Sequence, residues 1–155
     1  MWQGSVEAIY ITDDHGEAMR SLEQVPAVAG RGLEGDRYFK GTGTFSKKQN
    51  GPGRDITLIE REAIEAAEAK YEIDLSDGAP RRNIQTRGVP LNHLVGKQFM
   101  IGDVRVRGVK LCESCGYLES ITQKGVREAL IHRGGLRAEI VSDGTIKLGD
   151  PIREA

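Results

Sequence analysis

The only two cysteines of this chain, Cys112 and Cys115, stand three residues apart. A thiolate is a strong nucleophile and a soft metal ligand, so this pair is the first candidate for chemistry. A zinc site would need paired further ligands, which His15, His93 and His132 do not offer, and a redox pair would need a helix start that the strand-like flanks do not provide. We expect Cys112 to be a small buried hydrophobe, whereas Cys115, followed by a glycine that permits close approach, is open to a role as ligand or nucleophile.

Two arginine-containing segments could face an anion. The first is Gly35-Asp36-Arg37, whose backbone N–H groups and guanidinium could bind an oxyanion, with the guanidinium held by a bidentate Asp36–Arg37 pair. The alternative is a turn that the same salt bridge stabilises. Arg81 and Asn83 alternate in a run that we expect to be extended, so they would share one face. That pair could bind a phosphate or the amide-like edge of a heterocycle, and a solvated edge-strand face is the alternative.

Composition limits the class of protein. The chain has 155 residues, 38% of them hydrophobic, which suffices for one core, and we expect one domain over residues 1–155. With 22 basic and 23 acidic side chains the net charge is -1, so we expect neither nucleic acid nor a membrane surface as a partner. No apolar run approaches a membrane span and no signal-like segment opens the chain, so we expect a cytoplasmic protein with free thiols.

The elements that must position these residues are mainly strands. Twenty glycines and 5% aromatic residues favour tight turns between short strands. We expect seven or eight strands, a helix over 60–71 with Thr57 and Glu60 as a capping box, and short helices near 90–94 and 125–132. The expected strands are 6–11, a stretch ending at 28, 56–59, 81–86, 98–101, 104–111, 136–141 and 145–148. Pro26 places the second of these at an edge or a bend. The last two are expected to form a hairpin around Asp143-Gly144. Residues 40–53 are expected to form a surface loop, and the fold class is mainly β, a closed or nearly closed barrel with peripheral helices.

Four segments, in this order, together resemble the MOSC domain. They are Gly32-Leu33-Glu34-Gly35-Asp36-Arg37, then Arg81-Arg82-Asn83-Ile84 continuing to Gly96, then Cys112-Glu113-Ser114-Cys115, and last Gly144 to Ile152. This module is found at the C-terminus of molybdenum cofactor sulfurases and in mitochondrial amidoxime-reducing proteins. The resemblance implies a barrel-like MOSC fold and a pocket for the molybdenum cofactor, molybdopterin.

The resemblance also implies roles for individual residues. It places the catalytic residue and molybdenum ligand at Cys115, cofactor contacts at Arg81 and Asn83, and a phosphate contact near Thr57. The chemistry of the group agrees, because molybdenum in high oxidation states takes soft sulfur ligands. Its phosphate and polar ring suit donors such as Arg37 and the backbone N–H groups around Gly35 and Asp36.

Three functions follow as alternatives. The first is a cofactor-binding protein that either reduces N-hydroxylated compounds with an external electron donor or transfers sulfur for cofactor maturation. The second is a non-catalytic carrier of the cofactor or of sulfane sulfur, and the third is a β-barrel interaction module without cofactor. The chain has no cysteine set for an iron-sulfur cluster, so we expect a reductase or a cofactor-biosynthesis protein as its partner.

Overall fold

The computed structural model describes residues 1–14, 16–40, 55–76, 78–112 and 125–155. Residues 41–53 of the surface loop expected over 40–53 lie outside these ranges. Cys115 lies outside them as well. The helices of the described part are α1 (Arg37–Lys40), α2 (Arg61–Tyr71), the 3-10 turn η1 (Leu91–His93) and α4 (Val126–Ala129). Its strands are β1 (Gln3–Ile11), β2 (Arg20–Leu22), β3 (Gln24–Val28), β4 (Gly32–Leu33), β5 (Ile56–Glu60), β6 (Ile84–Arg87), β7 (Gln98–Ile101), β8 (Val104–Leu111), β9 (Leu136–Ile140), β10 (Gly144–Lys147) and β11 (Pro151–Glu154).

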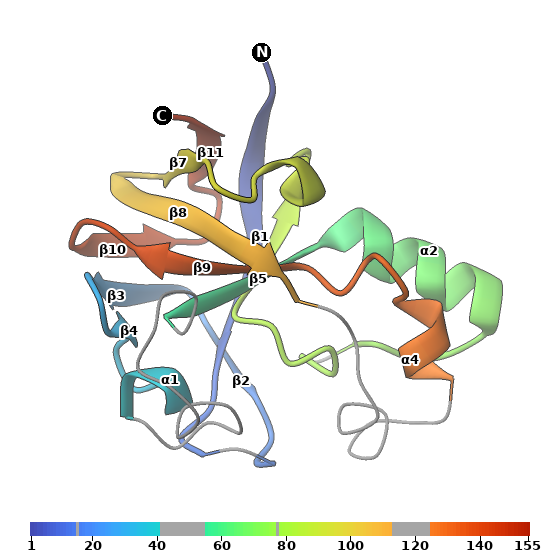
Figure 1. Ribbon diagram of the computed structural model, residues 1–155. Helices are drawn as coiled ribbons and strands as arrows, with labels where there is room; N and C mark the ends of the chain where they lie inside the picture. The colour runs from blue at the N-terminus through green and yellow to red at the C-terminus, as the bar shows by residue number, and fades with distance from the viewer. Residues whose placement is uncertain (15, 41–54, 77, 113–124) are drawn as a thin grey trace.

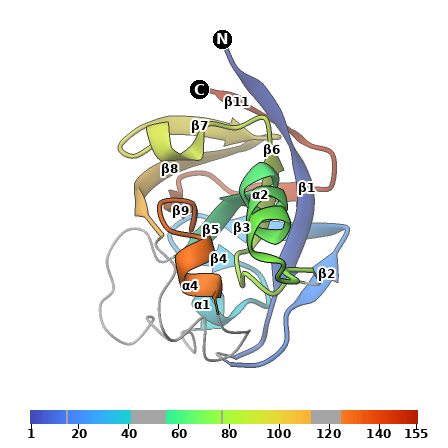
Figure 2. The same ribbon diagram turned by 90° about the vertical axis from the view of Figure 1, so that its right-hand side faces the viewer.

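Seven of these strands close into a barrel (Figures 1 and 2). The sheet runs in the order β11-β7-β8-β9-β5-β6-β1-β2, and β11 also pairs with β1, so that only β2 remains outside the ring. Adjacent strands are antiparallel except β5 and β6, which are parallel. Closure pairs the edges that an open sheet would leave exposed. The mainly β barrel with one longer and a few short helices is therefore confirmed.

Two hydrophobic clusters hold this arrangement together. The larger fills the barrel with inward side chains from alternate strand positions, such as Ile9, Leu58 and Phe99, each fully buried. The smaller joins α2 and α4 to the outer face of β5 through residues such as Ile59 and Ile64. Figure 1 shows both helices on one side of the barrel, with β3 and β4 on the other. None of the helices in the described part of the chain has the length and apolarity that a membrane crossing demands.

Helix α2 begins without the expected capping box. The N-cap residue Glu60, which ends β5, makes no side-chain cap, and its carboxylate instead accepts a hydrogen bond from Leu91 N–H at 3.1 Å. The Thr57 hydroxyl is turned toward Asn83, just before the neighbouring strand β6, at 3.1 Å. Because β5 runs directly into α2, Thr57 is still a strand residue, and its partners lie across the sheet rather than along the helix.

The expected hairpin around Asp143-Gly144 is also wrong. Strand β9 pairs with β8 and β5, whereas β10 pairs with β3 in a separate sheet of order β10-β3-β4. The Asp143 carboxylate accepts a hydrogen bond from Ala29 N–H at 2.8 Å, which draws the turn toward the end of β3. Because both edges of β9 are already paired, with β8 and with β5, β10 pairs with β3 instead.

Pro26 lies in a middle strand rather than at an edge. Its carbonyl accepts a hydrogen bond from Glu34 N–H at 2.9 Å, just past the end of the two-residue β4. In an antiparallel strand the carbonyl and the amide position of one residue face the same neighbour. Pro26 therefore lacks its N–H donor on the side that faces the end of β4. The ladder to β10, on the other side, loses no hydrogen bond. The count of seven or eight strands was low chiefly because β2, β4 and β11 were not predicted.

Candidate functional site

Thr57 and Asn83 form a buried polar clasp between three strands. The Asn83 amide oxygen accepts hydrogen bonds from the Thr57 backbone N–H at 3.0 Å and from its hydroxyl at 3.1 Å, while the Thr57 hydroxyl accepts from Asn83 N–H at 3.0 Å. The Asn83 amide nitrogen donates to the carbonyl of Tyr10 at 3.1 Å. Both residues are at most 1% exposed. The clasp fixes the end of β1 and the starts of β5 and β6 relative to one another.

Arg81 does not share a strand face with Asn83. Its φ is +60°, in the left-handed region, and β6 begins only at Ile84. The backbone N–H of Arg81 donates to the Gly78 carbonyl at 2.9 Å, which marks a turn, and its guanidinium donates to the carbonyl of Glu17. The alternation inferred from an extended run is therefore wrong at this point, because Arg81 lies in a turn before β6.

The Gly35-Asp36-Arg37 segment is tied to the same end of the barrel. Asp36 is fully buried, and one of its oxygens accepts hydrogen bonds from Thr12 N–H and from the Arg37 guanidinium, each at 3.1 Å. The ion pair uses a single contact and is not the expected bidentate pair. Arg37 also donates to the carbonyl of Arg81 at 3.0 Å, and Gly35 takes the left-handed φ of +89° that starts the turn into α1. The structure thus connects Arg37 with Arg81.

Arg82, which the sequence analysis did not select, is the buried arginine of this segment. Its guanidinium donates to the carbonyls of Gly134 at 2.7 Å, Pro80 at 3.2 Å and Cys112 at 3.4 Å. Cys112 follows β8 and is 3% exposed, which confirms it as a buried small side chain. Arg82 therefore joins the Arg81 and Asn83 segment to the strand that leads toward Cys115. No sequence signal distinguishes Arg82 from Arg81, because the distinction depends on the turn at Arg81.

A close backbone approach completes this junction. Cys112 N–H donates to the carbonyl of Gly135 at 2.7 Å, and Gly135 has a φ of +109°. A Cβ at position 135 would lie 1.9 Å from the carbonyl oxygen of Leu58, a distance that no side chain tolerates. Only glycine allows the segment before β9 to pass this close to β5.

The buried charges of the described residues are mostly positive. They are Asp36, Arg37, Asp55, Arg82 and Arg137. Arg137 lies on β9 directly opposite Thr57 of β5, beside the clasp. Burial raises the pKa of Asp55, although a hydrogen bond from Ile140 N–H opposes the shift. Three guanidiniums against two carboxylates give these buried positions an excess of positive charge, which suits a bound anion.

Comparison with known proteins places this geometry in context. The family model of the MOSC domain matches residues 46–153. The YuaD protein from Bacillus subtilis has a similar fold, with 17% identity and a TM-score of 0.76 over 98% of this chain and 97% of that one. YiiM from Geobacillus stearothermophilus shares 15% identity at a TM-score of 0.70, covering 98% of this chain and 75% of its own. YiiM from Escherichia coli shares 17% identity at a TM-score of 0.66, covering 97% and 69%. A search of curated proteins finds no match.

Proposed function

This chain belongs to the MOSC domain family, and from that premise we propose that it binds the molybdenum cofactor with Cys115 as the metal ligand and catalytic residue. The observation that supports this most is the Arg82 guanidinium, which bonds the Cys112 carbonyl at 3.4 Å. It holds Cys112, which precedes Cys115 by three positions in the sequence, beside the segment that carries Arg81 and Asn83. A thiolate presented next to cationic and amide groups suits a soft metal with an anionic organic ligand.

The residues at this end of the barrel fit such a group by charge. Arg81 and Arg37 supply guanidiniums for the phosphate, with backbone N–H groups around Gly35 and Asp36 as further donors. Because an excess of buried guanidinium charge is costly in an apolar surrounding, a bound anion would offset it.

Thr57 and Asn83 contribute to the site as a rigid wall. Their hydrogen bonds to each other and to Tyr10 fix three strands, so that groups on those strands keep their positions when a ligand enters. Arg137 stands opposite Thr57 and adds positive charge at this wall.

When bound, the cofactor supplies either two-electron reduction of an N–O bond, with release of water, or sulfur transfer for cofactor maturation. The reductive role requires an external electron donor, for which we propose a reductase as partner. In both roles Cys115 provides the sulfur contact, and the arginines orient the anionic group. The two roles differ in their substrates, so substrate assays decide between them.

The proposal is tested by purifying the protein from a host that makes the cofactor. Elemental analysis and pterin fluorescence should find molybdenum and pterin in the wild type and in Cys112→Ala, and neither in Cys115→Ala. Cys112→Ala is the matched control, because it removes the other thiol from a buried position next to the same segment. A wild type without molybdenum, or a fully loaded Cys115→Ala, would contradict cofactor binding through Cys115.

Turnover is measured on the loaded protein with a chemically reduced viologen dye as electron donor. Steady reduction of an N-hydroxylated base or an amidoxime supports the reductase. Stable loading without any turnover supports the carrier function instead.

A further inference from the structure

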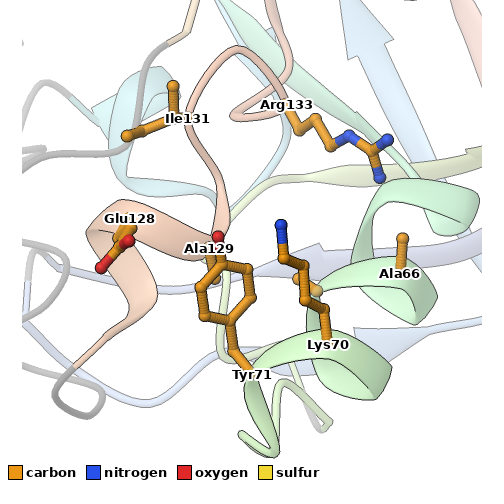
Figure 3. A pocket seen from close by; sticks show the side chains of 8 residues that line it. Ala66, Lys70, Tyr71, Glu128, Ala129, Ile131 and Arg133 are labelled. Carbon is orange, nitrogen blue, oxygen red and sulfur yellow. The ribbon is translucent and has the colours of Figure 1, made fainter.

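A pocket of about 520 Å³ opens between α2 and α4, outside the barrel (Figure 3). Its volume lies within the range of small-molecule sites, which run from roughly 300 to 1,000 Å³. None of the residues that we propose for cofactor binding lines it. The pocket therefore needs an explanation of its own.

The floor of this pocket is apolar. Ala67 of α2 and Ala129 of α4, 2% and 7% exposed, belong to the hydrophobic cluster between the two helices. The Tyr71 ring, which packs against the same cluster, lies beside them, and Ile131 stands at the rim with 52% of its surface exposed. Because alanines occupy the positions where the helices face each other, a planar apolar group has room against this floor.

Charged groups stand on opposite sides of the pocket. In Figure 3 the Lys70 ammonium and the Arg133 guanidinium lie on one side, the Glu128 carboxylate lies on the other, and the Tyr71 ring is between them. Lys70 contacts the Tyr71 ring at 5.4 Å from its centroid. Within the described ranges, no ion pair or side-chain hydrogen bond involves Lys70, Glu128 or Arg133.

Several exposed charges in the described part of the chain are paired, unlike these three. Arg87, for example, bonds both Glu7 and Glu65 at 2.9 Å. Burial raises the pKa of Glu60, and the charge of Arg133 lowers that pKa only as one of the smaller influences. The two cations and the opposed carboxylate thus remain available to a ligand that carries both kinds of charge.

We propose that this pocket binds a small amphoteric molecule with a flat apolar body, of the aromatic amino-acid type. The carboxylate lies between Lys70 and Arg133, the ring lies on Ala67 and Ala129 beside Tyr71, and the amino group faces Glu128. Binding here does not depend on the cofactor, because no residue is shared between the two sets.

Calorimetric titration of the full chain with three probes tests the ligand class. Phenylalanine should bind saturably with a Kd of about 1 mM or below, 3-phenylpropionate more weakly, and phenethylamine most weakly, because the pocket presents two cations and one carboxylate. Increasing salt should weaken the binding of phenylalanine. Absence of saturable binding by phenylalanine, or phenethylamine binding as tightly as phenylalanine, would overturn the proposal.

Substitutions then place the ligand in the pocket. The double variant Lys70→Gln with Arg133→Gln should weaken phenylalanine binding at least tenfold, whereas Lys147→Gln, which removes an exposed lysine on β10, should leave it unchanged. Ala66→Trp, at an exposed position of α2 that lines the pocket, should abolish binding by filling it while leaving every charge in place. Amide shifts caused by phenylalanine should fall at residues 66–71 and 128–133 in the wild type. Wild-type affinity in the double variant or in Ala66→Trp would refute the assignment, as would shifts confined to other residues.

Discussion

At the scale of single residues, Asp55 is a carboxyl whose ionised form is disfavoured by burial. It is 7% exposed, and one of its oxygens accepts a hydrogen bond from Ile140 N–H at 2.8 Å. Burial raises its pKa above the ordinary 3.8, the hydrogen bond from Ile140 opposes that shift, and the charge of Glu139 adds to it. The folded protein therefore holds the Asp55 proton more strongly than the unfolded chain does.

From this we predict a pH-dependent gain in stability for Asp55→Asn. An acid with a raised folded pKa favours the native state at low pH and disfavours it as pH rises through that folded pKa. The asparagine oxygen keeps the bond from Ile140 N–H without the charge. We compare the free energy of unfolding of Asp55→Asn with that of the wild type. The difference in favour of the variant should increase as pH rises from about 4 to about 7. Below the ordinary pKa of an aspartate it should no longer change with pH.

Urea denaturation of both proteins across this pH range measures the difference. Asp13→Asn is the opposite control, because a hydrogen bond from Lys40 lowers the pKa of the exposed Asp13, so its difference from the wild type should change in the reverse direction. A difference for Asp55→Asn that stays constant with pH would contradict the burial of an ionised carboxylate at this position.

At the scale of elements, Arg82 links the start of β6 with the segments after β8 and before β9. A guanidinium presents donors in a planar fork, whereas a lysine presents them from one point. Arg82→Lys cannot reach Gly134, Pro80 and Cys112 together, so carbonyls that are now bonded would stay buried without a donor. We predict that it lowers the free energy of unfolding by about 2–3 kcal/mol.

Urea denaturation measures this loss, and Arg105→Lys is the matched control. Arg105 makes a single exposed hydrogen bond to Gln98 at 2.9 Å, so its replacement should change stability by no more than about 0.5 kcal/mol. Amide resonances of Cys112 and Gly134 should shift in Arg82→Lys and not in Arg105→Lys. Equal stabilities of the two variants would mean that the three carbonyls find other donors.

Elements with their own periodicity were predictable from sequence, and long-range choices were not. Strands β7 and β8 fall on the predicted 98–101 and 104–111 because side chains alternate around a Gly102-Asp103 turn. The pairing of β10 with β3 is accompanied instead by the hydrogen bond from Ala29 N–H to Asp143, two residues that lie 114 positions apart in the sequence. No local sequence pattern predicts a contact over such a separation. The left-handed φ of Arg81 was hidden in the same way, since arginine rarely marks such a turn.

At the scale of the whole molecule, sequence identified which segments form the candidate site but not which atoms face one another. Segments around Gly35, Arg81 and the end of β8 were expected to act together, and bonds from Arg37 to Arg81 and from Arg82 to Cys112 connect them. The buried partner turned out to be Arg82, because a turn sets the face of each arginine. The positions of Cys115 and the residues around it lie outside the described ranges, so the metal ligand remains a prediction.

Closure of the barrel by β11 predicts how the molecule unfolds. Ile152 is fully buried, lies opposite Gly4 of β1 and Ile101 of β7, and thus sits on the seam that converts a sheet into a ring. Ile152→Ala should lower the free energy of unfolding by about 2–4 kcal/mol, through lost burial and the cavity left behind. Leu148→Ala removes a leucine that is 45% exposed, near the same end of the chain, and should cost much less.

The single tryptophan makes the cooperativity of this closure measurable, because Trp2 packs against the barrel core just before β1 begins. If the seam is part of one cooperative unit, tryptophan fluorescence and far-ultraviolet circular dichroism of Ile152→Ala will give coincident urea transitions, both displaced to lower urea. A fluorescence transition that precedes the loss of strand signal would contradict this, because it would mean that β11 leaves the barrel while the other strands stay paired. Coincidence is the expected result, since every strand of the ring is hydrogen-bonded on both sides and opening one seam exposes the inward faces of all seven.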